Sequence, residues 1–210
     1  MTPRQIPQIS SRKQPKQARS TDLVAAILEA ATQVLAKEGA QRFTTARVAE
    51  KAGVSIGSVY QYFPNKAAIL FRLQSDEWQQ TTTMLRTILE DVGRPPLERL
   101  HALVHAFIQS ECDEAGMRVA LNDAAPLYRD VPEAQAAKAS GDSIFRVFMQ
   151  EVLPTVPSES RALACELITT TLSAVGKDFS ESPRPPAEIK MYADAMARMF
   201  CAYIQDFDQA

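Results

Sequence analysis

Segments with apolar residues at helical spacing alternate along the chain with short breaks of glycine, proline and polar residues. In the first segment, Leu23, Ile27 and Val34 recur at the spacing of one helix face, and Gly39 is placed to end the helix. Further segments of this kind predict helices over 45–52, 56–62, 66–90, 97–112, 134–152, 158–175 and 189–207, with a loop over 176–186. Because no useful strand-like alternation or long repeat occurs, the pattern predicts an all-α chain of about nine helices.

The segment 44–62 predicts two helices joined by a four-residue turn, which is the helix-turn-helix arrangement. Gly53 can adopt the left-handed backbone conformation of the turn, and Ser55 can cap the second helix. Gly57 and Ser58 are poor helix formers, yet they lie on its first turn. Small residues there allow the helix backbone to approach another molecule, and the helix offers polar groups from Ser55, Ser58, Tyr60, Gln61 and Tyr62.

Charge is divided unevenly along the chain, although the whole carries only −2. Residues 1–72 contain 11 Lys and Arg and 4 Asp and Glu, a net charge of +7, whereas residues 73–210 contain 12 and 21, a net charge of −9. Residues 1–20 have five basic residues and no acid, which is typical of a flexible basic arm. The N-terminal third is therefore expected to meet a polyanion, either nucleic acid or an anionic membrane surface.

The run from Phe43 to Ser55 (FTTARVAEKAGVS), followed by Gly57, by YQYFPNK over 60–66 and by Leu70, resembles the TetR family of bacterial transcriptional regulators. The resemblance covers about a quarter of the chain, residues 23–70. Two positions depart from the family's pattern. Ile56 stands where a basic or small polar residue is common, and Ala67 stands where an acid is common.

The resemblance implies an all-α homodimer that binds a double-stranded DNA operator and is released by a small-molecule effector, acting as a repressor in the cytoplasm without a cofactor. It implies a helix-turn-helix DNA-binding domain over 21–66, after the arm 1–20, and a ligand-binding and dimerisation domain over 67–210. Matched by position, the DNA-binding residues are Thr44, Thr45, Arg47, Ser55, Ile56, Gly57, Ser58, Tyr60, Gln61, Tyr62 and Lys66. Tyr60 and Tyr62 are two residues apart on one helix, so we expect one to face inward and the other outward.

Large apolar side chains in the second part of the chain are mostly expected in its core, with a few lining an effector pocket. The candidates for the pocket are Trp78, His105, Phe107, Met117, Phe145, Phe148 and Met149. The apolar stripe of the last helix could be intramolecular core or, with the helix before it, a four-helix bundle across a two-fold axis. The dimer interpretation selects Ala164, Ile168, Thr171, Ile189, Tyr192, Met196, Met199, Phe200 and Tyr203.

Glu98, His101, His105 and Cys112 share one helix face at a spacing typical of metal ligands. A metal site there would need further ligands from another helix, so we predict no metal and interpret this face as a polar flank of the helix. The three cysteines, Cys112, Cys165 and Cys201, are too sparse for a disulfide framework.

Two other function classes are weaker alternatives. An enzyme is not expected, because the sequence has no phosphate-binding glycine loop, nucleophile elbow or oriented Cys/His pair. A helical protein that binds a membrane surface or a protein partner through its basic N-terminal region would fit the charge, but a membrane-binding helix would show a broad apolar face in place of Gly57 and Ser58. No stretch approaches the length of a membrane-spanning helix, and the N-terminus does not resemble a secretory signal.

Overall fold

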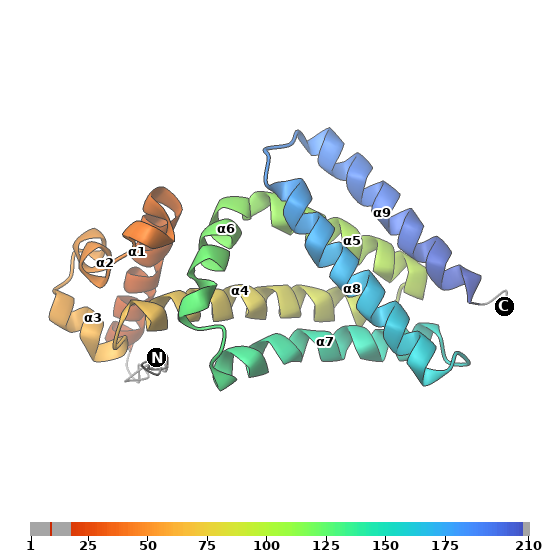
Figure 1. Ribbon diagram of the computed structural model, residues 1–210, viewed down its shortest axis with the longest axis horizontal. Helices are drawn as coiled ribbons and strands as arrows, with labels where there is room; N and C mark the ends of the chain where they lie inside the picture. Colours follow the sequence, from red (N-terminus) through yellow and green to blue (C-terminus); the bar gives the residue numbers. More distant parts are fainter. Residues whose placement is uncertain (1–8, 10–17, 208–210) are drawn as a thin grey trace, which may run out of the picture. The chain divides into compact units, whose positions relative to one another are not determined.

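The computed structural model describes residue 9 and residues 18–207, except for the side chains of residues 18, 19 and 136–142, and in that part of the chain the regular structure is entirely helical (Figure 1). The all-α prediction is confirmed. The basic arm predicted for residues 1–20 lies almost wholly outside the described residues. The elements are α1 (Ala18–Arg42), α2 (Thr45–Ala52), α3 (Ile56–Tyr62), α4 (Lys66–Leu89), α5 (Pro96–Asp113), α6 (Ala115–Ala124), a 3₁₀ turn (Ala125–Leu127), α7 (Pro132–Val152), α8 (Ser158–Ser180) and α9 (Pro186–Asp206).

The chain divides into two compact units. The first contains the chain up to Glu77 together with Gly116–Ala137, and the second contains Trp78–Ala115 together with the chain from Lys138 onward. The continuous helix α4 therefore contributes its first half to one unit and its second half to the other.

Helices α1, α2 and α3 bury one apolar face each in the first unit. Ile27 and Leu35 of α1, Val48 of α2 and Val59 of α3 have no exposed surface, and Phe63 after α3 is also buried. Following α3, Phe63 thus closes the core of the three helices. Gly39 has φ +71° and ψ 171°, so the helical path of α1 is broken at the residue predicted to end it.

In the same unit, Tyr128 anchors the segment after α6. Its hydroxyl donates a hydrogen bond to the carbonyl oxygen of Leu121 at 3.1 Å and lies 3.2 Å from Oε1 of Gln74, and its ring packs against Phe71. Burial raises the pKa of Tyr128, so the phenol stays protonated at neutral pH. Arg118 of α6 forms an ion pair with Glu77 at the end of this unit's part of α4, with 2.8 Å between nitrogen and oxygen.

Helix α5 is central to the second unit, packing against both α8 and α9. Its apolar face, formed by Leu100, Leu103, Val104 and Ile108, is fully buried. At Gly176 of α8, a Cβ atom would come within 3.1 Å of the ring of Phe107 and within 3.3 Å of Cγ of Glu111. The absence of a side chain at Gly176 therefore permits the close packing of α8 on α5.

Two expectations about helices in the second half of the chain need correction. Helix α8 continues to Ser180, so the first five residues of the predicted loop 176–186 are helical, with Gly176 and Phe179 buried. The sequence interpretation also placed no helix over 115–124, where α6 forms with Ala120, Leu121 and Ala124 on its buried face. No helix among the described residues has the length and apolar character needed to cross a membrane.

Candidate nucleic-acid interface

The turn between α2 and α3 has the geometry that its sequence predicts. Gly53 has φ +68° and ψ 28°, and its N–H donates to carbonyl oxygens at the end of α2. The N–H of Val54 donates to the carbonyl oxygen of Ala49 at 3.0 Å, which closes the turn. Since the left-handed conformation is unfavourable for residues with a Cβ, glycine at position 53 fixes the path between the two helices.

Helices α2, α3 and α4 each begin at a capping side chain. Thr44 Oγ1 accepts a hydrogen bond from the N–H of Arg47, Ser55 Oγ accepts one from the N–H of Ser58 at 3.0 Å, and Asn65 Oδ1 accepts one from the N–H of Ala68 at 2.9 Å. The caps satisfy only part of the free N–H groups at each helix start. The starts of α2, α3 and α4 therefore keep donors and a partial positive charge that favour phosphate oxygens.

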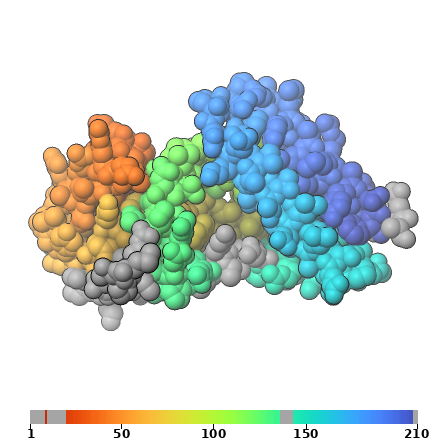
Figure 2. Space-filling model, in the orientation of Figure 1, coloured from red at the N-terminus to blue at the C-terminus, as the bar shows by residue number. Residues whose placement is uncertain are grey.

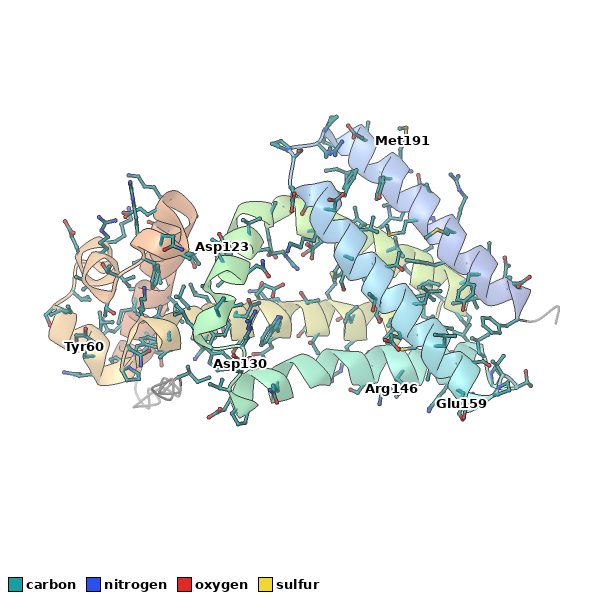
Figure 3. All side chains as sticks on the ribbon, in the orientation of Figure 1. Tyr60, Asp123, Asp130, Arg146, Glu159 and Met191 are labelled. Atoms are coloured by element: carbon teal, nitrogen blue, oxygen red, sulfur yellow. The ribbon has the colours of Figure 1, made fainter. Side chains whose placement is uncertain are left out.

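The outward face of α3 is accessible and uncharged. Ile56 and Tyr60, one turn apart, are 45% and 39% exposed, and Gly57 and Gln61 are also exposed. Tyr60 projects from the outer side of the helix (Figure 3). The sequence of α3, IGSVYQY, contains no charged residue, so this helix can offer only neutral hydrogen-bonding and apolar groups to a partner.

Gly57 lies where the fold itself does not need a glycine. A Cβ added there would meet only Ser55 Oγ, at an ordinary contact distance of 3.7 Å, and the residue has helical backbone angles. Alanine would therefore fit the protein and would favour the helix. The presence of glycine instead of alanine at position 57 is explained if a second molecule comes within contact distance of the α3 backbone at this point.

Positive charge beside α3 comes from neighbouring elements. Lys66 starts α4 and Lys51 lies exposed near the end of α2. Arg47 is half-exposed and forms an ion pair with Glu38, while its Nη1 donates to the carbonyl oxygen of Arg42 at 3.4 Å. A phosphate contact by Arg47 would have to compete with the Glu38 carboxylate.

The eleven residues matched as DNA contacts fall into two groups. Nine are exposed or half-buried on α2, α3 and the start of α4: Thr44, Arg47, Ser55, Ile56, Gly57, Ser58, Tyr60, Gln61 and Lys66. The side chains of Thr45 and Tyr62 are buried, at 8% and 7% exposure. Thr45 can contribute only its backbone N–H, and Tyr62 packs inward while Tyr60 faces outward, as their spacing predicts.

Two pockets formed by described residues of the second unit bear on an effector site. One, of about 370 Å³, lies between the last turns of α4, the start of α5 and the C-terminal half of α7, with Leu89, Arg99, Ile144, Phe148 and Glu151 in its wall. The other, of about 950 Å³, is an open surface depression along α8 that includes Arg146, Cys165, Thr169 and Lys177. Of the candidate pocket residues, Phe148 lines the smaller one, whereas Phe145 and Met149 are packed in the core and line neither.

The remaining pocket candidates are dispersed. Trp78, Phe107 and Met117 are half-buried and line neither of the two pockets. His105 faces α9, where it contacts Asp194. The smaller pocket instead contains an ion pair that the sequence analysis did not identify, in which buried Arg99 binds the carboxylate of Glu151 and donates to the carbonyl oxygen of Leu89 at 2.5 Å. The sequence around Arg99 contains no local pattern that would indicate the burial of this arginine.

The nine dimer residues chosen from the apolar stripe differ in exposure. Five of them, Ala164, Ile168, Ile189, Met196 and Phe200, are buried within the core of one chain and offer almost no side-chain surface to a second copy. The apolar stripe seen in the sequence therefore includes the side of α8 and α9 that packs against α5. Thr171, Tyr192 and Tyr203 are half-buried, and Met199 alone of the nine is exposed.

Apart from Met199, the large apolar side chains that α8 and α9 leave exposed were not among the nine. Leu163 and Leu167 lie one turn apart on α8, 64% and 49% exposed, and Met191 and Met199 lie two turns apart on α9, 68% and 52% exposed. Helix α8 lies on the surface facing the viewer in Figure 2, and Met191 projects from α9 in Figure 3. The i, i+4 pair Leu163 and Leu167 was the available sequence signal for a second apolar face.

Two family models together match most of the chain. The model described as bacterial regulatory proteins, tetR family, matches residues 27–73, which include α2, the turn and α3. The model described as tetracyclin repressor-like, C-terminal domain, matches residues 95–207, more than half of the chain.

The chain is also similar in sequence to individual regulatory proteins. The chain is 24% identical over 143 residues to the HTH-type transcriptional repressor KstR of Rhodococcus jostii, covering 68% of this chain and 66% of that protein. It is 36% identical over 83 residues to the nucleoid occlusion factor SlmA of Vibrio campbellii, covering 39% of this chain and 42% of that protein. The aligned regions thus span about two fifths to two thirds of these curated relatives.

The fold is also found in a solved structure, that of the fatty acid degradation regulator FadR from Bacillus halodurans. It superposes with a TM-score of 0.65 at 18% identity, covering 91% of this chain and 96% of that one. The match of the C-terminal model to more than half of the sequence, with the N-terminal model on the helix-turn-helix, places the chain in its family. The chain belongs to the TetR family of bacterial regulatory proteins.

Proposed function

We propose that the protein is a ligand-responsive transcriptional repressor that binds duplex DNA as a homodimer and reads bases with α3 in the major groove. The observation that carries this proposal is Gly57, which lies on an exposed helix at a position where a side chain would meet only Ser55 Oγ, at an ordinary contact distance, so the fold does not need a glycine there. A major groove accepts a helix, whose first residues reach the base edges. Gly57 and its neighbours Ile56 and Ser58 form that first turn of α3.

The elements on either side of α3 are suited to the phosphate backbone. The N-terminal starts of α2 and α4 offer N–H groups, while Arg47 and Lys66 add positive charge. We therefore assign base reading to Ile56, Gly57, Ser58, Tyr60 and Gln61, and backbone contacts to Thr44, Thr45, Arg47, Ser55 and Lys66. Tyr62 is left out of the contact set because its side chain is buried.

We assign DNA binding to residues 21–66 and effector binding with dimerisation to residues 67–210. The exposed apolar side chains of α8 and α9 support a dimer surface, with Leu163, Leu167, Met191 and Met199 as its anchors. A two-fold dimer would present two copies of α3 about 34 Å apart to a near-palindromic operator.

The effector is assigned to the smaller pocket of the second unit. Three of its residues, Arg86, Leu89 and Glu90, lie at the end of α4, and its wall combines apolar side chains with the Arg99–Glu151 pair. A ligand there would contact the helix that runs on from the DNA-binding segment, so occupancy can bias the position of α4. The lining favours a small molecule with an apolar body and one polar or charged end.

Fluorescence anisotropy with labelled duplexes tests the DNA-binding function. The full-length protein is titrated with DNA from upstream of its own gene, with duplexes selected from a random pool, and with scrambled duplex. We expect one near-palindromic sequence to bind preferentially, and Tyr60→Ala to weaken that binding by about tenfold while leaving binding to scrambled DNA little changed. Val119→Ala, at an exposed apolar position of α6, serves as the control. Equal affinity for selected and scrambled duplexes would refute sequence-specific recognition.

A further inference from the structure

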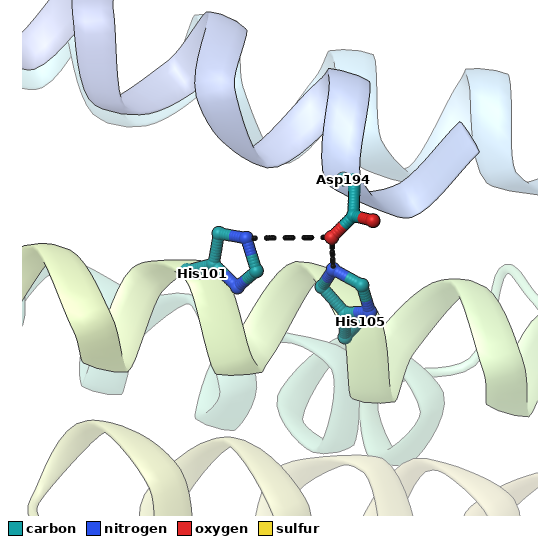
Figure 4. Close-up of side chains that lie close together, drawn as sticks. All are labelled: His101, His105 and Asp194. Carbon is teal, nitrogen blue, oxygen red and sulfur yellow. Dashed lines mark ion pairs between the residues drawn. The ribbon is translucent and has the colours of Figure 1, made fainter. Parts of the chain in front are cut away.

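Two histidines and one carboxylate meet between α5 and α9 (Figure 4). His101 and His105 lie one turn apart on α5, and their Nε2 atoms are 3.6 and 2.8 Å from Oδ1 of Asp194 on α9. One ligand atom from each residue lies within 4.8 Å of the others. These are the only two histidines in the sequence. The helix face that the sequence analysis left without a partner thus receives its third group from a residue 89 positions after His105.

The buried Nε2 atom of His105 is directed at a carboxylate oxygen. It lies 2.8 Å from Oδ1 of Asp194, a contact that is an ion pair only when the imidazole carries a proton. The two imidazole rings stack with centroids 4.6 Å apart, so both Nε2 atoms are directed to the same carboxylate oxygen. Nitrogen and carboxylate lone pairs this close together require a proton or a cation between them.

We infer that His101, His105 and Asp194 bind one divalent transition-metal ion, Zn²⁺ being the best match, and so link α5 to α9. Neutral imidazoles and a carboxylate are ligands that Zn²⁺ and its neighbours in the series accept. In a tetrahedral site with metal–ligand bonds near 2.0–2.1 Å, adjacent ligand atoms lie about 3.3 Å apart. The observed N–O distances of 2.8 and 3.6 Å bracket that value, so small side-chain rotations suffice. Three protein ligands leave one position for water.

The second oxygen of Asp194 is already engaged. Lys190 Nζ lies 2.7 Å from Oδ2, one helical turn earlier on α9. This hydrogen bond orients the carboxylate and leaves Oδ1 directed towards the histidines.

Calorimetric titration of Zn²⁺ into full-length, tag-free, chelator-treated protein tests the inference. We expect one ion per chain and an upward shift in melting temperature on the order of 5 °C at saturation. His101→Ala, His105→Ala and Asp194→Asn should each weaken binding by about tenfold or more. Asp206→Asn, at the exposed end of α9, should bind like the wild type, and Lys190→Ala should weaken binding less than the three ligand variants because Lys190 orients Asp194 without binding the ion. An Asp206→Asn variant that loses the ion would contradict the site.

Histidine-ring NMR gives a readout that requires no variant. Since both histidines lie in the cluster, the complete set of ring signals reports on it. Stoichiometric Zn²⁺ should shift both sets of ring resonances together in the wild-type protein. Unchanged ring signals, or undiminished binding in a folded His101→Ala/His105→Ala variant, would overturn the inference and would assign any bound Zn²⁺ to other groups.

Discussion

Arg47 of α2 and Glu38 near the end of α1 form an ion pair on the surface that carries the helix-turn-helix. The cation that we propose to meet a phosphate is therefore held by an internal carboxylate in the protein alone. To bind a phosphate, Arg47 has to leave Glu38. Substitutions of the two residues are therefore expected to have opposite effects on DNA binding.

Glu38→Gln should tighten DNA binding by about two- to fivefold, because Arg47 no longer exchanges a charged partner for phosphate. Arg47→Ala should weaken binding to all sequences alike and should reduce the slope of log K against log salt by about 1. Anisotropy at several salt concentrations measures both. Asp76→Asn, which removes the partner of Arg72 in another half-exposed ion pair, is the control and should leave the slope unchanged. A slope unaffected by Arg47→Ala would mean that this residue touches no phosphate.

Gly57→Ala should separate folding from DNA recognition. The open space around Gly57 and its helical backbone predict a protein that is as stable as the wild type, or more stable by about 0.5 kcal/mol. A methyl group between α3 and the DNA should weaken operator binding by about tenfold or more. Urea unfolding and anisotropy measure the two quantities.

Gly116→Ala is the matched control for Gly57→Ala. Gly116 lies on the first turn of α6 and also has open space around it, but it lies outside the proposed contact surface. It should give the same small gain in stability with no loss of DNA affinity. Equal DNA binding by both alanine variants would remove the observation on which the proposed orientation of α3 depends.

The buried guanidinium of Arg99 predicts a stability cost when its counter-ion is neutralised. Arg99 is 2% exposed and Glu151 is 48% exposed, so the pair is partly screened by solvent. Glu151→Gln should lower the free energy of unfolding by about 1–2 kcal/mol, less than for a fully buried pair. Glu90→Gln, which breaks the solvent-exposed Arg86–Glu90 pair, should cost no more than about 0.5 kcal/mol. Equal costs in urea unfolding would show that burial of Arg99 does not matter.

Leu167→Glu should produce a monomer if α8 forms the dimer surface. A carboxylate at this position would be desolvated opposite its own two-fold copy or an apolar neighbour. Sedimentation velocity should show the loss of the dimer, and operator affinity should fall because only one α3 then engages. Val147→Glu changes an apolar residue of α7 that is 66% exposed, and it should leave the oligomeric state unaltered. A dimeric Leu167→Glu variant would place the interface elsewhere.

Local sequence signals predicted the elements that depend on nearby residues. Thr44, Ser55 and Asn65 cap helices through bonds to residues three positions later, and Gly53 determines the turn through its own φ angle. Such interactions are contained in a short window, so the helix-turn-helix could be located from the sequence. The kink at Gly39 follows from the same conformational freedom of glycine.

Features that depend on which helices pack together were not accessible in this way. The apolar stripe of α9 has the same period whether it meets α5 of its own chain or a second copy, so the dimer residues chosen from it include several that are buried in the chain's own core. For the same reason, Phe145 and Met149 were chosen as pocket residues, although both pack in the core. The proximity of Asp194 to His105, and of Glu151 to Arg99, arises from contacts between distant segments that no local pattern encodes.

Gly176 keeps two helices of the second unit in tight register, since its hydrogen leaves room for the ring of Phe107. A larger residue at position 176 would clash with side chains of α5 and would increase the distance between α8 and α5. A substitution at this one position can therefore change the spacing of α5 and α8 without changing any side chain of α3. The second unit can in this way vary its packing while the helix-turn-helix keeps its sequence.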